Sequence, residues 1–166
     1  MNPKNKIVIT VINDLTYDRR MARICESLTG AGYNVLLTGR LLPDSKPLQK
    51  KNYHQHRIRC FYNKGKLFYF EYNLRLFLFL LFKHFDYFYS VDLDTLSAGF
   101  SVSLLKRKPC IYDAHEYFPE VPEVFQRNFV KKIWLSIERN IVPRLKYAIT
   151  VSDSIAEIYF NKYNVK

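Results

Sequence analysis

Blocks of hydrophobic residues alternate with polar segments along the chain, and their periods predict strands and helices in turn. Residues Ile7 to Ile12 form a continuous β-branched run, which is typical of a strand buried on both faces of a parallel sheet. From Arg19 to Thr29 the apolar residues recur at helical spacing, and Gly30 and Gly32 end the predicted helix.

The same alternation continues to the end of the chain. Further strands are predicted at Tyr33–Thr38, Arg57–Tyr62, Tyr87–Val91, Pro109–Asp113 and Tyr147–Val151. Further helices are predicted at Leu67–Phe85, from Asp92 to about Leu105, at Phe125–Ile141 and after Ser152, where Ser154 and Glu157 have capping-box spacing. Leu41 to His56 is a polar insertion. This order predicts an α/β fold: a doubly wound, mostly parallel, Rossmann-like sheet in a single domain.

Length and composition agree with a domain that has its own core. The chain has 166 residues, of which 48% are hydrophobic. The longest apolar stretch, Leu76 to Phe82, is far shorter than the ~20 residues that cross a bilayer. Three isolated cysteines, Cys25, Cys60 and Cys110, predict reduced thiols, and no signal peptide precedes the first strand. We therefore expect a cytoplasmic protein.

The charge is strongly basic, with 26 Lys and Arg against 15 Asp and Glu and a net charge of +11. This balance favours an anionic partner. The basic residues are scattered and no nucleic-acid-binding motif occurs, so no nucleic acid partner is expected. The helix Leu67–Phe85 is apolar nearly all round and is accompanied by Lys64, Lys66, Arg75 and Lys83. Two interpretations stay open: burial in the core or a domain contact, or peripheral contact with an anionic membrane at its inner face.

Candidate functional residues follow the strands, because ligands of open α/β sheets bind outside the carboxyl ends of the strands. The segment Cys110–Glu120 ends a strand in a cluster of ionisable groups. His115 within it is the candidate catalytic residue, because histidine titrates near neutrality. The candidate substrate-binding residues at this edge are Asn13, Asp14, Arg19, Asp92, Glu116 and Ser152. Asp18 is expected to cap the first helix, and Asp113 to play a structural part.

Several common sites are excluded by missing motifs. The first loop, Asn13 to Asp18, has no glycine, so it is not a dinucleotide-binding G-x-G-x-x-G turn, and neither a P-loop nor a G-x-S-x-G nucleophile occurs. The segment Asp92-Leu93-Asp94 resembles a D-x-D metal pair, but Asp94 is better placed to cap the following helix. We therefore expect neither a metal nor a cofactor.

Several segments, in order, resemble the amino-terminal domain of the retaining GT-B glycosyltransferases of family four, over nearly the whole chain. They are Asp18-Arg19-Arg20 with Ser27 to Val35, then Asp92 to Leu96, Tyr112 to Glu116, and Ala148 to Ser152 with Ser154. The resemblance implies metal-free transfer of a sugar, with retention, from a nucleotide-sugar donor to an acceptor.

The resemblance also assigns parts of such an enzyme to this chain. Residues 1–166 match the acceptor-side domain, and the donor-binding carboxyl-terminal domain is absent from the chain. The implied acceptor is lipid-linked or a polysaccharide, His115 contacts the transferred sugar, and the isolated chain is expected to be inactive. The first loop, which lacks glycine, departs from the phosphate-contacting loop of many members.

Two other functions stay open. The chain is alternatively a non-catalytic binding or membrane-recruiting subunit of a split glycosyltransferase. A third interpretation is an unrelated hydrolase or epimerase-like domain that uses Asp113, His115 and Glu116.

Overall fold

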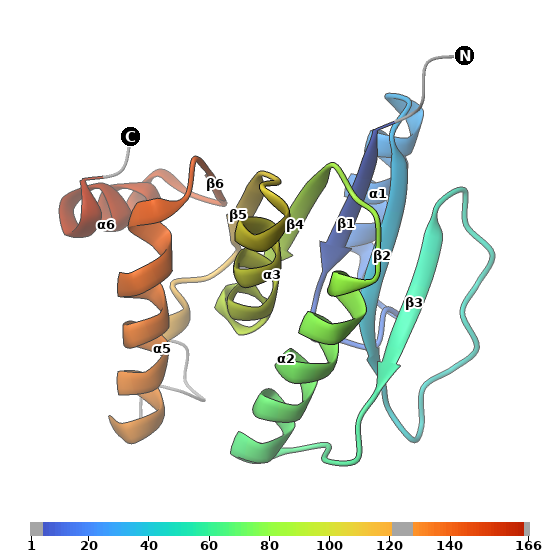
Figure 1. The fold of residues 1–166 in the computed structure, drawn as a ribbon, viewed down its shortest axis with the longest axis horizontal. Coiled ribbons are helices and arrows are strands. Elements are labelled where there is room, and N and C mark those ends of the chain that lie inside the picture. Colours follow the sequence, from blue (N-terminus) through green and yellow to red (C-terminus); the bar gives the residue numbers. More distant parts are fainter. Residues whose placement is uncertain (1–4, 121–127, 165–166) are drawn as a thin grey trace.

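A computed structural model describes residues 5–120 and 128–164, which form a six-stranded sheet with helices on both faces (Figure 1). The strands are β1 (Lys6–Thr10), β2 (Asn34–Leu41), β3 (His54–Arg59), β4 (Tyr87–Val91), β5 (Cys110–Ala114) and β6 (Tyr147–Thr150). The helices are α1 (Arg19–Gly30), α2 (Gly65–Leu81), α3 (Leu93–Lys106), α5 (Asn128–Ile141) and α6 (Asp153–Tyr163), with 3-10 turns at Phe118–Glu120 and Val142–Arg144.

The strand order is β3-β2-β1-β4-β5-β6, and each neighbouring pair is parallel. From β1 the chain winds outward through α1 to β2 and β3, and α2 then carries it back across the sheet to β4 on the other side of β1. The direction of winding therefore reverses between β1 and β4, and ligand sites of such sheets lie at this reversal. The predicted α/β, doubly wound, Rossmann-like fold is confirmed.

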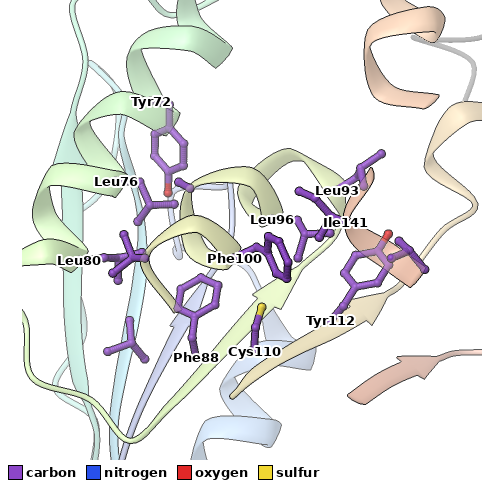
Figure 2. Close-up of a cluster of buried hydrophobic side chains, with 14 of the residues drawn as sticks. Tyr72, Leu76, Leu80, Phe88, Leu93, Leu96, Phe100, Cys110, Tyr112 and Ile141 are labelled. Atoms are coloured by element: carbon purple, nitrogen blue, oxygen red, sulfur yellow. The ribbon is translucent and has the colours of Figure 1, made fainter. Parts of the chain in front are cut away.

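The larger part of the core lies between the sheet and the layer formed by α2, α3 and α5 (Figure 2). Phe88 of β4 and Leu96 of α3 are fully buried at its centre. Gly99 of α3 lies directly on Phe88, because a Cβ built at Gly99 would be 1.8 Å from a carbon of the Phe88 ring. A glycine at this position lets α3 approach the sheet more closely than any other residue would.

The opposite face of the sheet is covered by α1. Ile7 and Ile9 of β1 belong to the same buried cluster as Met21 and Cys25 of this helix, whereas Val8 of β1 belongs to the larger cluster on the other face. Both faces of β1 are thus covered, which explains why its sequence is a continuous apolar run rather than an alternating one.

Several predicted boundaries differ from the structure. β1 ends at Thr10, and the polar insertion is shorter than predicted because β2 continues to Leu41 and β3 begins at His54, where the two strands pair. α2 ends at Leu81, after which Phe85 turns into the core. The beginning of the helix predicted from Phe125 lies outside the described residues.

The start of α6 also corrects a prediction. The capping box at Ser154 and Glu157 is wrong: Ser152 is the N-cap, and its hydroxyl accepts a hydrogen bond from the amide of Ile155 at 3.4 Å. Among the described helices, none combines the length and the apolar character that crossing a bilayer requires.

Candidate functional site

The loop that follows β5 is held to the end of β4 through the backbone of His115. Its N–H donates to Asp92 Oδ1 at 3.0 Å and to the carbonyl oxygen of Asp113 at 3.2 Å. The N–H of Asp92 donates to the same carbonyl at 2.9 Å. These contacts place His115, which is exposed, beside the carboxylate of Asp92 at the end of the neighbouring strand.

Asp92 holds this position with an unusual backbone. Its φ of 57° and ψ of 174° fall in a region that residues other than glycine rarely adopt, and such conformations cluster at functional sites. Burial raises the pKa of Asp92 to about 6, although the amides of His115 and Glu116 oppose the rise by hydrogen bonding to the carboxylate. The carboxyl of Asp92 therefore changes charge close to neutral pH.

The end of β5 is fastened by a buried ion pair. The carboxylate of Asp113 is fully buried. Arg20 Nη2 donates a hydrogen bond to each of its two oxygens, at 2.8 Å to Oδ1 and 2.6 Å to Oδ2. The hydroxyl of Tyr89 donates to Asp113 Oδ2 at 2.7 Å. Asp113 thus joins α1, β4 and β5 next to the loop of His115. This agrees with the structural role that the sequence predicts for it.

The first loop, residues 13–18, is ordered by its own side chains. Asn13 Nδ2 donates to Asp18 Oδ2 at 2.6 Å, and Asn13 Oδ1 accepts from the amide of Leu15 at 2.9 Å. Asp18 also caps α1 by accepting from the amide of Met21 at 2.9 Å, which confirms its predicted role. The loop packs on Gly39 of β2, where a Cβ would lie 2.4 Å from the carbonyl oxygen of Asn13.

These elements enclose a cavity of about 290 Å³ at the reversal point between β1 and β4. Its size is at the lower end of the ~300–1,000 Å³ typical of small-molecule sites. The lining residues are Val11, Ile12, Asn13, Asp18, Arg20, Met21, Val91, Asp92, Asp94 and His115. The predicted residues Asn13, Asp92 and His115 are therefore brought together, although they come from three separate segments of the chain.

Asp94 adds a third carboxyl to this cavity, besides those of Asp18 and Asp92. It is buried in the first turn of α3 rather than at its cap, so the predicted capping role is wrong. Burial and the neighbouring charge of Asp92 raise its pKa well above the ordinary value, which favours the protonated acid. Among the described residues, its Oδ1 has no hydrogen-bond partner.

Two other predicted binding residues lie outside the cavity. The carboxylate of Asp14 accepts hydrogen bonds from the amide and hydroxyl of Thr16 and from Ser45 at 2.8–3.0 Å. Burial raises its pKa, but these hydrogen bonds and Arg57 outweigh burial and bring the pKa below its ordinary value. Arg19 is exposed and lines a separate cavity of about 600 Å³ with Thr16 and Arg57.

The last two predicted residues are also separate from the cavity wall. Glu116 is exposed next to His115, and its backbone N–H donates to Asp92, while the charge of its side chain acts on the same carboxyl. Ser152 lies beyond β6, where its hydroxyl caps α6. The structure thus assigns Ser152 a role in the fold.

Sequence reasoning missed three residues of the site, namely Arg20, Tyr89 and Asp94. A signal existed for Arg20, since a buried Asp113 at a strand end requires a cation or several donors. The other histidines lie elsewhere: His54, His56 and His84 line a cavity of about 360 Å³ beside the first residues of β1, β2 and β3, at the opposite edge of the sheet.

The cavity combines groups that suit a ligand rich in hydroxyls. An amide, an imidazole and a guanidinium supply hydrogen-bond donors, and the three carboxyls of Asp18, Asp92 and Asp94 supply acceptors. Among the described lining residues there is no serine or cysteine that would serve as a nucleophile. Within the described part of the chain, no group of three or more His, Cys, Asp or Glu side chains is arranged to hold a metal ion.

Three solved structures illustrate the likeness in fold. Sucrose-phosphate synthase from Thermosynechococcus elongatus matches with a TM-score of 0.74 at 14% identity, over 96% of this chain and 45% of that chain. A putative UDP-N-acetylglucosamine 2-epimerase from Listeria monocytogenes matches with a TM-score of 0.57 at 13% identity, over 96% of this chain and 42% of that chain. UDP-GlcNAc 2-epimerase from Methanocaldococcus jannaschii matches with a TM-score of 0.57 at 14% identity, over 99% of this chain and 43% of that chain.

These likenesses establish the fold, and the chain spans less than half the length of each of these three structures. No protein with a curated function matches the chain significantly. The family model Glycosyltransferase Family 4 matches residues 18–166, which include α1, the Asp92 turn and the loop of His115. The chain therefore belongs to glycosyltransferase family 4.

Proposed function

We propose that the chain is the acceptor-side domain of a glycosyltransferase that moves a sugar from a nucleotide-sugar donor to a lipid-linked or polysaccharide acceptor. The observation that carries this proposal is the cavity lined by Asn13, Asp92 and His115 at the reversal point of the sheet. Membership of family 4 supports the transferase chemistry. We propose a cytoplasmic location, at the inner face of a membrane.

In this proposal the residues of the cavity have different roles. His115 is the catalytic residue, because its exposed imidazole contacts the transferred sugar and stabilises charge that develops on it. Asp92 holds the loop of His115 in place, and Arg20 and Asp94 offer hydrogen bonds to hydroxyl groups of the acceptor. The donor is held mainly by a further domain, so these residues alone bind it weakly.

The alternative is a non-catalytic binding subunit that recruits a separate catalytic chain to its substrate. The exposed position of His115 supports the catalytic interpretation, because a purely structural histidine at this place would be expected to pack against the loop. In the alternative, His115→Ala would leave the activity of the assembled complex intact.

Binding to an array of bacterial and eukaryotic glycans, followed by calorimetry, tests the proposal. We expect the chain to bind a subset of glycans, Asp94→Ala to weaken that binding at least tenfold because Asp94 is assigned to the acceptor, and nucleotide sugars alone to bind weakly. His84→Ala is the control, since His84 lies at the opposite edge of the sheet. Glycan binding that is unchanged in Asp94→Ala would refute the assignment of the site.

A further inference from the structure

Helix α2 is apolar on two opposite faces, and the residues that the structure describes cover only one of them. Within the described structure its inner stripe, formed by Phe68, Tyr72, Leu76 and Leu80, is buried against the sheet and α3. The outer stripe repeats every three or four residues and consists of Leu67, Phe70, Leu74 and Leu78 in the helix and Phe82 at its end. These five side chains are 47–87% exposed, which is rare for a row of large apolar residues.

A groove continues this outer stripe toward α5. It encloses about 320 Å³ between α2 and α5, which lie on the same side of the sheet (Figure 1), and its walls are almost entirely apolar. Tyr69 and Phe70 form one wall, and Ile133, Trp134 and Ile137 form the other. At the groove's end Lys66 Nζ lies 4.3 Å from the ring centre of Phe129, another largely exposed aromatic residue.

The apolar surface has a cationic border. Lys64 and Lys66 lie at the start of α2, Lys83 lies just after its end, and all three are exposed. The one acidic residue of α2, Glu71, accepts from Arg75 at 2.7 Å and from the amide of Phe61 at 2.9 Å, so its charge is already neutralised. An apolar stripe bordered by exposed lysines complements a surface that is apolar inside and anionic outside.

We propose that the outer stripe of α2 and the groove beside α5 dock peripherally on an anionic phospholipid bilayer. The 17-residue helix, about 25 Å long, lies in the plane of the interface with its aromatic side chains at the boundary of headgroups and acyl chains. Lys64, Lys66 and Lys83 contact lipid phosphates, and the groove takes up part of an acyl chain. Docking of this kind does not depend on the transfer activity proposed above.

The docking face lies next to the candidate site. Asn73 lines the groove, and its Nδ2 donates to the backbone oxygen of Asp94 at 2.8 Å, while Asp94 lines the site cavity. The groove and the cavity therefore lie on the two sides of this one contact. A bilayer on the face of α2 would therefore lie beside the candidate site, which fits an acceptor attached to lipid.

Flotation of the 166-residue chain with vesicles tests the docking. We expect the chain to float with vesicles that contain phosphatidylglycerol, to float poorly with pure phosphatidylcholine, and to be released by salt. Phe70→Ser/Phe82→Ser should abolish flotation, and Lys64→Gln/Lys66→Gln should weaken partitioning by about 10- to 30-fold. Tyr17→Ser is the matched control, because Tyr17 is 75% exposed but precedes α1, which covers the opposite face.

Circular dichroism and size-exclusion chromatography verify that each variant is folded. The proposal is overturned if binding is independent of anionic lipid, or if folded Phe70→Ser/Phe82→Ser floats as well as the unmodified chain. It is also overturned if this face instead joins two copies of the chain, so that the unmodified protein is a dimer that ignores vesicles and the double variant is a monomer.

Discussion

Asp92 and His115 are joined across two neighbouring strands by a hydrogen bond of 3.0 Å from the backbone N–H of His115 to the Asp92 carboxylate. Asp92 makes this contact from a backbone conformation that is costly for a residue with a side chain, by about 1–3 kcal/mol. The carboxylate is also partly buried, which disfavours its charged form. Together these features indicate that the position of the His115 loop is maintained at the expense of stability, as is common at functional sites.

The unfavourable burial of Asp92 should appear in the pH dependence of stability. With a pKa of about 6 in the folded state and about 4 when unfolded, Asp92 keeps a proton in the folded state that the unfolded chain releases. Stability is therefore lost as the pH rises from about 4 to about 6, by up to about 3 kcal/mol. Urea unfolding across this range should show that the loss is smaller in Asp92→Asn, whose amide cannot ionise.

Asp94 also has a raised pKa, so the unmodified chain shows the contributions of both carboxyls. The difference between the chain and Asp92→Asn isolates the contribution of Asp92. Parallel pH profiles for the two proteins would contradict the assigned burial penalty.

Two adjacent arginines should differ sharply in their contribution to stability. Arg20→Ala leaves the fully buried carboxylate of Asp113 with Tyr89 as its remaining side-chain partner, so we expect the free energy of unfolding to fall by about 3 kcal/mol. Arg19→Ala removes an exposed side chain and should change the free energy of unfolding by less than about 0.5 kcal/mol. Chemical denaturation of both variants measures the contrast, and equal losses would refute the role given to the ion pair.

The contrast between Arg19 and Arg20 also shows where prediction from sequence ends. The fold could be predicted because apolar runs and helical periods are local signals, and the meeting of Asn13, Asp92 and His115 follows from parallel strands that end at one edge. Which arginine turns toward the sheet depends on the rotation of α1 about its axis, where one residue changes the direction by about 100°. That rotation is decided by packing between segments that are 93 residues apart.

The start of α3 gives a second physical reason. Local spacing predicts Asp94 as the cap, but the positive φ of Asp92 shifts the beginning of the helix and turns Asp94 inward. No local pattern reveals such a conformation at a residue other than glycine. Similarly, the composition of α2 left burial and exposure open, because its inner and outer stripes are equally apolar and differ only in what covers them.

Replacement of Gly99 by alanine should disrupt the contact between α3 and β4. The added methyl would lie 1.8 Å from the buried ring of Phe88, which cannot move without displacing its neighbours. We therefore expect the free energy of unfolding to fall by about 1–3 kcal/mol. Gly30→Ala is the matched control, since that helical glycine has no atom within 4 Å of the added methyl. Thermal unfolding should show Gly30→Ala to be neutral or slightly stabilising, whereas a similar melting temperature for both variants would disprove the close packing at Gly99.

The attachment of α6 should depend on one buried carboxylate. Glu138 of α5 is fully buried, and its Oε1 accepts hydrogen bonds of 2.6 Å from both Lys162 Nζ and the hydroxyl of Tyr163. Lys162→Met leaves the charge of Glu138 without its cation, so we expect α6 to open locally and its amides to lose at least tenfold of their protection against hydrogen exchange. Adding Glu138→Gln removes the buried charge as well and should restore part of the protection. If Lys162→Met exchanges like the unmodified chain, packing rather than this ion pair holds α6 in place.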